Sequence, residues 1–266
     1  MMTLYKYHGA GNDFLIGDNR DGAIVLDTAK IQLLCDRHLG FGSDGLMLLE
    51  NSDTYDFAMK FYNPDGSSGM MCGNGGRCIV AFAADKGYKS FNFDAPDGPH
   101  QAQIIQKGNP KIVRLRLKDV RQFKKISQQE YFMDTGTRHF IRLVDNIENY
   151  DVPAEGRKIR FDKRFAPIGT NADFMCVEDN KLKVRTYEKG VEDETLACGT
   201  GIVASAIAAY MSGIPCFALE NGVCKYNVLA KISSLSVEFR PIDNGIGFTD
   251  IWLTGPAEYV GDIIVK

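Results

Sequence analysis

One short pattern occurs twice in this chain and constrains its fold more than any other feature. "MMCGNGGRC" begins at Met70, and "TLACGTGIV" begins at Thr195. In both, a cysteine is followed by Gly, by Asn or Thr, and by Gly again, and an alanine-rich apolar stretch comes next. The two cysteines, Cys72 and Cys198, lie 126 residues apart. The repeat predicts two similar half-molecules that each present one thiol.

The segments that follow the two cysteines are predicted helices. They run from about Asn74 to Gly87 and from about Thr200 to Gly213, and both end on a glycine, which commonly terminates a helix. Both are apolar nearly all round, which predicts burial inside a domain. A third predicted helix, Asp27 to Gly40, begins at an aspartate N-cap and ends at a glycine.

Short alternating runs predict strands in most of the remaining chain, for example "AQIIQ", "IVRLRL", "KLKVRTY", "LSVEFRP" and "DIWLTGP". The basic segment "EGRKIRFDKRF", residues 155–165, is interpreted as a solvated strand with charged edges rather than as a polyanion site. "GNDF" at residues 11–14 resembles "GTNADF" at residues 169–174, as a duplication would predict. We therefore expect an α+β chain in which a buried helix wrapped by short strands occurs twice.

The polar segment "KDVRQFKKISQQE", residues 118–130, marks the predicted boundary between the halves. We expect an N-terminal domain over residues 1–120 that carries Cys72 and a C-terminal domain over residues 121–256 that carries Cys198. The last segment, residues 257–266, is a strand that can return to the N-terminal domain.

Composition narrows the classes of partner. A formal net charge of −3 gives no general reason to bind nucleic acid or an anionic membrane. Apolar runs are too short for a membrane span, and the N-terminus lacks the regions of a secretory signal. Seven cysteines, an odd number at irregular spacing, fit a reducing cytoplasm.

Several roles are open for the two cysteines. Structural zinc usually takes closely spaced ligand pairs, whereas Cys72 and Cys78 are separated by five residues. A disulfide between Cys72 and Cys198 is sterically possible if the halves face each other, but it disagrees with a reducing compartment. Catalysis explains more residues, because a helix N-terminus lowers the pKa of a thiol and binds carboxylates. The glycines alone are also compatible with two tight strand-to-helix turns.

Two such helix ends facing each other would hold one carboxylate with a sulfur on each side. That arrangement suits inversion of a carbon next to a carboxylate, in which a thiolate takes the α-proton and a thiol on the opposite face returns one. The converging N–H groups would stabilise the negative charge of the intermediate. We therefore predict a racemase or epimerase.

"YHGAGNDF", "FYNPDGSSGMMCGNGGRC", "GTNADF" and "YEKGVEDETLACGTG" together resemble the diaminopimelate epimerase family, in order and over essentially the whole chain. The resemblance implies a two-thiol enzyme that uses no metal and no cofactor and interconverts LL- and meso-diaminopimelate for lysine and peptidoglycan synthesis. It implies an α+β fold of two pseudo-symmetric domains, each a strand barrel around a central helix, with the active site in the cleft between them. It also implies a cytoplasmic homodimer that acts on a small molecule and has no nucleic-acid or membrane partner.

The resemblance also implies the site residues. Cys72 and Cys198 match the catalytic thiols, and His139 and Glu188 match a polar pair that tunes their proton affinity. The positions that match the substrate site are Asn12, Asn63, Gly73, Asn74, Thr137, Asn171, Glu188, Lys189, Gly199 and Thr200.

Three positions depart from the family's pattern. Thr137 and Arg138 stand where the family has Asn-Pro or Ser-Pro, and Lys189 replaces an arginine that grips the distal carboxylate with a bidentate fork. An Arg138 that pointed into the pocket would compensate. Gly261 stands where the family often has a dimer-interface aromatic residue, and Tyr259 lies two positions earlier. Because the first two departures touch recognition of the distal group, a racemase of another polar amino acid, such as histidine, stays open.

Three further classes fit the sequence less well. Proline-racemase relatives resemble CGHG at the first thiol, where Asn74 stands here, and phenazine-type isomerases lack the paired cysteines. A non-catalytic carboxylate-binding protein would explain the glycines but not both thiols. The sequence does not distinguish which cysteine rests as the thiolate, because the two helix ends look equivalent.

Overall fold

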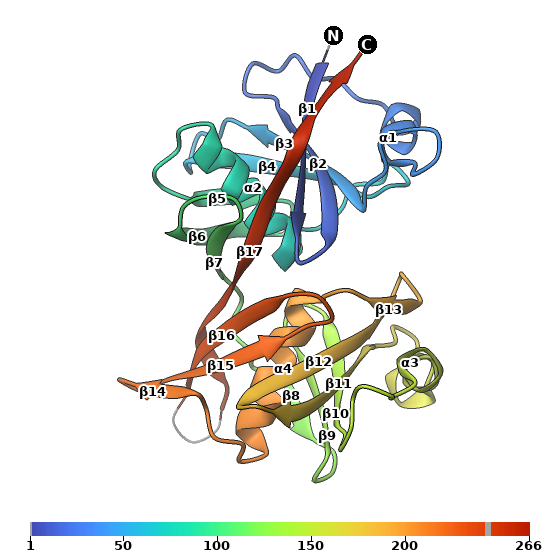
Figure 1. Cartoon of the computed structure of the whole chain (residues 1–266), viewed down its shortest axis with the longest axis vertical. Coiled ribbons are helices and arrows are strands. Elements are labelled where there is room, and N and C mark those ends of the chain that lie inside the picture. The colour runs from blue at the N-terminus through green and yellow to red at the C-terminus, as the bar shows by residue number, and fades with distance from the viewer. Residues whose placement is uncertain (1, 243–245) are drawn as a thin grey trace. The chain divides into compact units, whose positions relative to one another are not determined.

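The structure is a computed structural model, and it describes residues 2–242 and 246–266. The chain divides into two compact units: unit 1 comprises Met1–Leu115 and Gly255–Lys266, and unit 2 comprises Arg116–Thr254. In each unit, strands surround a long helix (Figure 1). The α+β class predicted from the sequence is confirmed. Among the described residues, the helices are all too short or too polar to cross a membrane.

Unit 1 is built from strands and two helices. Its elements are β1 Met2–Gly9, β2 Asn12–Asp18, α1 Thr28–Cys35, β3 Gly45–Glu50, β4 Phe57–Tyr62, α2 Gly73–Asp85, β5 Asn92–Ala95, β6 Gly98–Gln106 and β7 Lys111–Arg116. The long strand β17, Phe248–Val265, contributes its later part, which pairs antiparallel with β1.

Unit 2 is likewise built from strands and helices. Its elements are β8 Phe123–Lys125, β9 Glu130–Asp134, β10 Arg138–Leu143, α3 Val152–Arg160, the 3-10 turn η1 Lys163–Phe165, β11 Asn171–Glu178, β12 Lys181–Glu188, β13 Asp193–Thr195, α4 Gly199–Met211, β14 Ala218–Glu220, β15 Val223–Leu229 and β16 Ser234–Pro241, with the earlier part of β17. The five runs quoted above as predicted strands lie in β6, β7, β12, β16 and β17, except that Leu117 follows the end of β7.

The strand pairing of unit 1 recurs in unit 2. The order is β1–β2–β3–β4–β5–β6–β7 in unit 1 and β9–β10–β11–β12–β15–β16–β17 in unit 2. Both series run antiparallel, parallel, antiparallel, parallel, antiparallel, antiparallel. Helices α1 and α3 fall at the same place in the two series, as do α2 and α4. The predicted duplication is therefore confirmed by topology.

Helices α2 and α4 are the central helices, and both lie close to their predicted bounds. Cys72 is the N-cap of α2 and Cys198 is the N-cap of α4. Gly87 and Gly213, which follow the helix ends, have φ of +97° and +82°, a backbone conformation that favours glycine. Apolar side chains cover these helices on nearly every side and are buried against the strands, as predicted.

Helix α1 is shorter than predicted. Asp27 caps its N-terminus by accepting from the Lys30 N–H, as expected, but the helix ends at Cys35 instead of continuing to Gly40. The side chain of Asp36 accepts from the backbone N–H groups of the two residues at positions 38 and 39. Such local side-chain bonds compete with the helix, which explains the early end.

The interpretation of residues 155–165 as a strand is wrong, because this segment belongs to helix α3 and the turn η1. Asp151 caps the helix by accepting from the Ala154 N–H. Val152, Gly156 and Ile159 are buried at helical spacing, and the basic residues occupy the last turn, where they complement the helix dipole. Charged residues between these apolar positions produced the misleading alternation.

The likeness of "GNDF" to "GTNADF" does not mark equivalent positions. In the parallel pair β2–β3, Phe14 lies opposite Gly45, and in the matching pair β10–β11, His139 lies opposite Asn171. Phe14 therefore corresponds to His139, and "GNDF" corresponds to "GTRH" at residues 136–139. The similarity of the two quoted motifs predicted the duplication correctly but paired the wrong strands.

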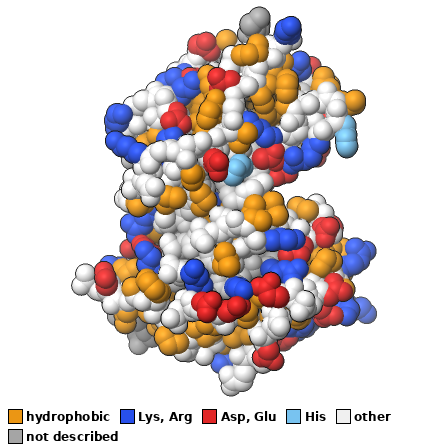
Figure 2. Space-filling model, viewed as in Figure 1, with side chains coloured by type: hydrophobic (Ala, Val, Ile, Leu, Met, Phe, Trp, Pro, Cys, Tyr) orange, Lys and Arg blue, Asp and Glu red, His pale blue; other side chains and the backbone are white. Residues whose placement is uncertain are grey.

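Charged side chains of both signs are interspersed on each unit, on the face that Figure 2 shows. Several form local ion pairs, such as Lys183 with Glu148 and Arg185 with Glu194. This mixed pattern agrees with the small net charge of the sequence.

Candidate active site

Cys72 is the N-cap residue that precedes helix α2 in unit 1. Its backbone is extended, with φ of −111° and ψ of 154°, as an N-cap residue requires. The sulfur accepts a hydrogen bond from the Gly75 N–H at 3.2 Å and is half-buried. A sulfur that accepts from a free helix N–H is stabilised as a thiolate.

A buried arginine lies beneath this helix end. Nη1 of Arg77 donates to the Gly73 carbonyl at 3.0 Å, and Nη2 donates to Asn74 Oδ1 at 2.9 Å. The Arg77 side chain is fully buried, and burial lowers its pKa, while the sulfurs of Cys78 and Cys72 act in the opposite direction. The prediction missed Arg77. A cation inside an otherwise apolar helix was the signal that could have found it.

The asparagines of unit 1 lie in two places. Asn74 is buried, and its Nδ2 donates to Asn12 Oδ1 at 3.3 Å, so these two predicted site residues meet. Asn63 forms hydrogen bonds within its own turn, where Nδ2 donates to Ser67 Oγ at 3.0 Å. The predicted role of Asn63 in substrate binding therefore stays a prediction.

Cys198 is the N-cap residue of helix α4 in unit 2 and is buried. Burial raises the pKa of this thiol well above its usual range, and the charges of Glu188 and Asp173 raise it further. The Thr200 hydroxyl, 3.4 Å from the sulfur, and the Gly201 N–H have the opposite effect on this pKa. The Gly201 N–H at the helix end thus lowers the pKa of this thiol, as expected, but burial and the two carboxylates outweigh it.

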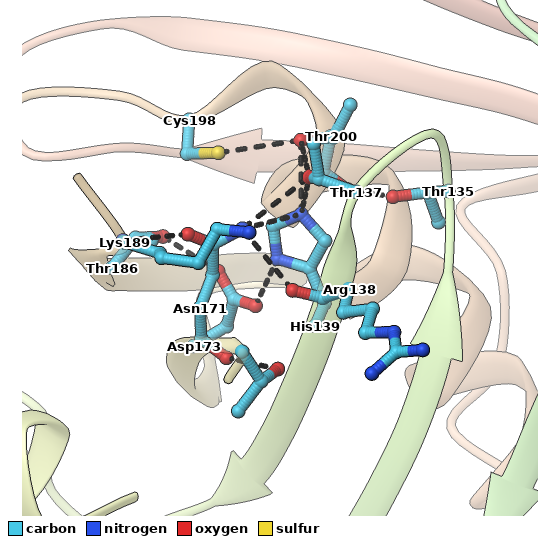
Figure 3. Close-up of polar contacts among 11 residues, drawn as sticks. Thr135, Thr137, Arg138, His139, Asn171, Asp173, Thr186, Lys189, Cys198 and Thr200 are labelled. Carbon is cyan, nitrogen blue, oxygen red and sulfur yellow. Dashed lines mark hydrogen bonds and ion pairs between the residues drawn. The ribbon is translucent and has the colours of Figure 1, made fainter. Parts of the chain in front are cut away.

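His139 lies at the centre of a buried polar cluster behind Cys198 (Figure 3). Its Nδ1 is 2.7 Å from Asp173 Oδ2, and both side chains are completely buried. Its Nε2 is 2.9 Å from Thr137 Oγ1 and 2.9 Å from Thr200 Oγ1. The cluster therefore connects a buried carboxylate to the hydroxyl that touches Cys198.

Asn171 completes this cluster and has a fixed orientation. Its Oδ1 accepts from the Lys189 backbone N–H at 2.8 Å, and its Nδ2 donates to the Arg138 carbonyl at 3.1 Å. The same Nδ2 lies 3.3 Å from His139 Nε2 and 3.3 Å from Thr137 Oγ1. Four residues that the sequence predicted separately are thus brought together: Thr137, His139, Asn171 and Thr200.

Arg138 and Lys189 contribute backbone groups to this cluster, since the Arg138 carbonyl and the Lys189 N–H form hydrogen bonds with Asn171. In Figure 3 the Arg138 guanidinium is directed away from Thr200 and Cys198, as expected because alternate residues of a strand face opposite sides. This orientation does not support compensation by Arg138 inside the cluster. Glu188, the last residue of β12, acts on Cys198 through its charge.

Asp173 and Thr186 belong to the cluster but were not predicted. Thr186 Oγ1 donates to Asp173 Oδ1 at 2.7 Å, and the two residues lie opposite each other in the β11–β12 pair. A signal existed, since Asp173 lies two residues after Asn171 and therefore on the same face of the strand.

Tyr259, placed by the sequence near a family interface position, lies in β17. Its hydroxyl donates to Asp262 at 2.8 Å, and its ring lies 5.4 Å from that of Tyr7. Gly261 lies opposite Lys6 in the β1–β17 pair. Within residues 2–242 and 246–266, His, Cys, Asp and Glu side chains form no group of three that could hold a metal ion.

Comparison with known proteins places this chain in a family. The family model for diaminopimelate epimerase matches residues 4–117 and 131–224. Diaminopimelate epimerase from Flavobacterium psychrophilum is 43% identical over 97% of this chain and 98% of its own length. The enzyme of that name from Chlorobaculum tepidum is 39% identical over 95% of this chain and 96% of its own length.

Solved structures with the same fold are more distant in sequence. A phenazine biosynthesis protein from Bacillus anthracis superposes with a TM-score of 0.72 at 16% identity, covering 100% of this chain and 99% of its own. A hydroxyproline epimerase from Agrobacterium vitis gives 0.66 at 13% identity, covering 98% and 91%. These likenesses show the fold alone, whereas the family model and the sequence relatives show that this chain belongs to the diaminopimelate epimerase family.

Proposed function

We propose that this protein interconverts LL- and meso-diaminopimelate, with Cys72 and Cys198 as an acid–base pair. One observation carries the proposal: both units repeat the same strand series around a helix whose N-cap is a cysteine. Two thiols at equivalent helix ends are what inversion by two bases requires. Relatives that share 43% and 39% of their residues with this chain carry the name of this activity, which supports diaminopimelate over another polar amino acid.

In the proposed reaction, the thiolate of one cysteine removes the α-proton, so that the C–H bond breaks and an S–H bond forms. The electron pair left on the carbon delocalises into the carboxylate. The thiol of the other cysteine then gives its proton to the opposite face of the carbon and becomes a thiolate. The pair has exchanged protonation states, so each cysteine acts as base for one stereoisomer and as acid for the other.

Stabilisation of the carbanion is the largest demand on this site. We assign it to the backbone N–H groups at the starts of the two central helices, at Gly73 and Asn74 in α2 and at Gly199 and Thr200 in α4. Preorganised N–H donors aimed at developing negative charge are typically worth about 3–4 kcal/mol of barrier each. This role requires the substrate to bind in a cleft between the two units, which is part of the proposal.

Recognition of the distal amino-acid group is assigned to the side chains that surround these helix ends. Asn12, Asn63, Thr137 and Asn171 would supply amide and hydroxyl groups. Lys189 would bind the distal carboxylate as a single ammonium, which gives less geometric selection than a guanidinium fork. We therefore expect weaker discrimination between amino acids that differ at the distal carboxylate.

The wider context follows from this activity. An epimerase of diaminopimelate serves lysine and peptidoglycan precursor synthesis, and we propose a cytoplasmic homodimer that uses neither a metal nor pyridoxal phosphate. His139 and Glu188 are proposed to tune the proton affinity of the thiols. Gel filtration with light scattering would test the dimer.

Incubation of the reduced protein with LL-diaminopimelate in D₂O, followed by proton NMR, tests the proposed function. The expected result is loss of the α-proton signal together with formation of the meso isomer. If diaminopimelate is unchanged while a panel of other polar amino acids exchanges its α-protons, the protein is a racemase of a different substrate. If none of them exchanges, the protein is not an enzyme of this type.

A further inference from the structure

The two units fill one equivalent buried position with different chemistry. In the repeated strand series, His139, Asp173 and Thr186 of unit 2 correspond to Phe14, Met47 and Phe61 of unit 1. The glycines three residues after each cysteine support this correspondence. A Cβ on Gly75 would contact Met47 and Phe14, and a Cβ on Gly201 would contact Asp173 and His139.

The fold therefore does not need polar residues at this position. Unit 1 fills it with apolar side chains, with Phe14 and Phe61 in edge contact at 6.0 Å between ring centroids. Burying a carboxylate is costly unless it is paired and hydrogen-bonded. The polar set of unit 2 therefore needs an explanation other than stability.

The hydrogen bonds of this polar set define which ring nitrogen of His139 carries the proton. An ionised carboxylate only accepts, so the 2.7 Å contact with Asp173 places the proton on Nδ1. Nε2 then faces the Thr200 hydroxyl, which lies 2.9 Å away and touches the Cys198 sulfur at 3.4 Å. An unbroken series of contacts thus runs from Asp173 to Cys198.

We propose that Asp173 is a positioning residue that holds His139 so that Nε2 exchanges a proton with Cys198 through the Thr200 hydroxyl. This inference rests on the proposed function, because it explains how the buried thiol alternates between acid and base. Cys198 lies among the negative charges of Glu188 and Asp173, so its thiolate needs a compensating positive charge. A protonated His139, stabilised by Asp173, supplies it.

The proton balance of this step is closed within the cluster. The S–H bond of Cys198 breaks and its proton passes to Thr200 Oγ1, while the hydroxyl proton of Thr200 passes to His139 Nε2. The result is a thiolate, an unchanged threonine and an imidazolium ion. Its Nδ1–H donates to the Asp173 carboxylate. The reverse transfer restores the thiol, and no further reactant is needed.

The direction in which Asp173→Asn changes the alkylation rate of Cys198 distinguishes this proposal from direct charge repulsion. Asp173→Asn removes a negative charge near Cys198, so direct repulsion alone predicts more thiolate and a faster reaction of Cys198 with iodoacetamide. The proposal predicts the opposite, because His139 without the carboxylate holds a proton less well. We expect alkylation of Cys198 to be about tenfold slower, as for loss of a charged hydrogen bond.

The experiment uses the full chain at neutral pH, with mass spectrometry of the Cys198 and Cys72 peptides. Thr200→Val should also slow alkylation of Cys198, whereas Thr200→Ser, which keeps the hydroxyl, should stay within about twofold of the parent. The double variant Asp173→Asn/Thr200→Val should be no slower than the slower single variant, because both act through one series of contacts. Cys72 should react at the same rate in every variant.

Two controls keep the result interpretable. Buried Cys78 should stay unmodified in every folded variant, so its alkylation would reveal unfolding. The ¹⁵N resonances of His139 should show a protonated Nδ1 in the parent and lose this preference in Asp173→Asn, which a merely structural role would not change. Faster alkylation of Cys198 in Asp173→Asn, or independent effects in the double variant, would overturn the proposal. Alkylation requires no substrate, so this outcome is separate from failure of the proposed function.

Discussion

The first turns of α2 and α4 have the same backbone arrangement, a cysteine N-cap followed by a helix, but they differ in the charges around them. Arg77 follows Cys72 by five residues and lies buried beneath it, whereas Val203 follows Cys198 by the same interval. The guanidinium and the Gly75 N–H favour negative charge on the Cys72 sulfur.

The surroundings of Cys198 have the opposite character. Burial and the nearby carboxylates of Glu188 and Asp173 disfavour negative charge on its sulfur. The comparison shows that two topologically equivalent thiol positions have unequal environments. In the proposed acid–base pair, one sulfur is a thiolate while the other is a thiol, a state that unequal environments favour.

Removal of either sulfur should have the largest effect. Cys72→Ala and Cys198→Ala should each lower the rate of epimerisation by at least about 10²–10⁴-fold, because each removes one of the two proton-transfer groups. Turnover by proton NMR checks this, and circular dichroism controls for folding. If one variant keeps more than about a tenth of the activity, the two sulfurs do not act as a pair.

The next largest difference should come from adding a methyl group to the two equivalent glycines, Gly75 and Gly201. The two substitutions should affect activity and stability unequally. The Cβ of Gly201→Ala would lie 2.2 Å from Asp173 Oδ1, whereas that of Gly75→Ala would lie 3.3 Å or more from its neighbours. We expect Gly201→Ala to displace Asp173, to lower activity more than about tenfold and to cost about 1–3 kcal/mol of unfolding free energy. Gly75→Ala should cost less on both measures. Equal losses of activity and of unfolding free energy in the two variants would contradict the difference in packing between the starts of α2 and α4.

Substitution of the buried cation should have a smaller effect, confined to unit 1. Arg77→Met should slow alkylation of Cys72 by about three- to tenfold, because a positive charge near the sulfur is lost. Cys198 should react as before, and Arg77→Lys, which retains the charge, serves as the matched control. An unchanged rate at Cys72 in Arg77→Met would show that the guanidinium has only a structural role.

The smallest expected effect concerns acid stability. Burial raises the pKa of Asp13, but hydrogen bonds from Arg37 and Lys6 outweigh it and bring the pKa to about 2. The folded state therefore gains stability above the unfolded pKa of about 3.9 and loses it as the pH falls towards 2. Asp13→Asn should remove about 1 kcal/mol of this dependence, since the site is only partly screened from solvent. Urea unfolding at pH 5 and pH 2.5 measures it, and equal pH dependence in both proteins would contradict the assignment.

The sequence predicted those features that depend on local chemistry. The cysteine caps, the glycines after the central helices and most strands follow from short patterns, and the structure has them. The pairing of Asp173 with Thr186 was out of reach because the two residues meet only through strand register. Arg77 had a signal, a cation inside an apolar helix, but its contact with the Pro256 carbonyl in the last strand depends on the fold.

Errors came from patterns that two structures share. Charged residues between Val152, Gly156 and Ile159 imitate a strand edge, although the spacing of these three is helical. "GNDF" and "GTNADF" look alike, although register pairs "GNDF" with "GTRH". Register depends on side-chain packing across strands, which a single sequence does not reveal.

The central claim is that two sulfurs, one on each face, invert the α-carbon. The most direct test is to place LL-diaminopimelate and the enzyme in D₂O and to follow the earliest product by proton NMR. Two bases predict that the first meso product carries deuterium at the inverted carbon, while the remaining LL isomer still carries its proton. If the early product keeps the original proton, one group removed and returned it, and the two-thiol account is contradicted.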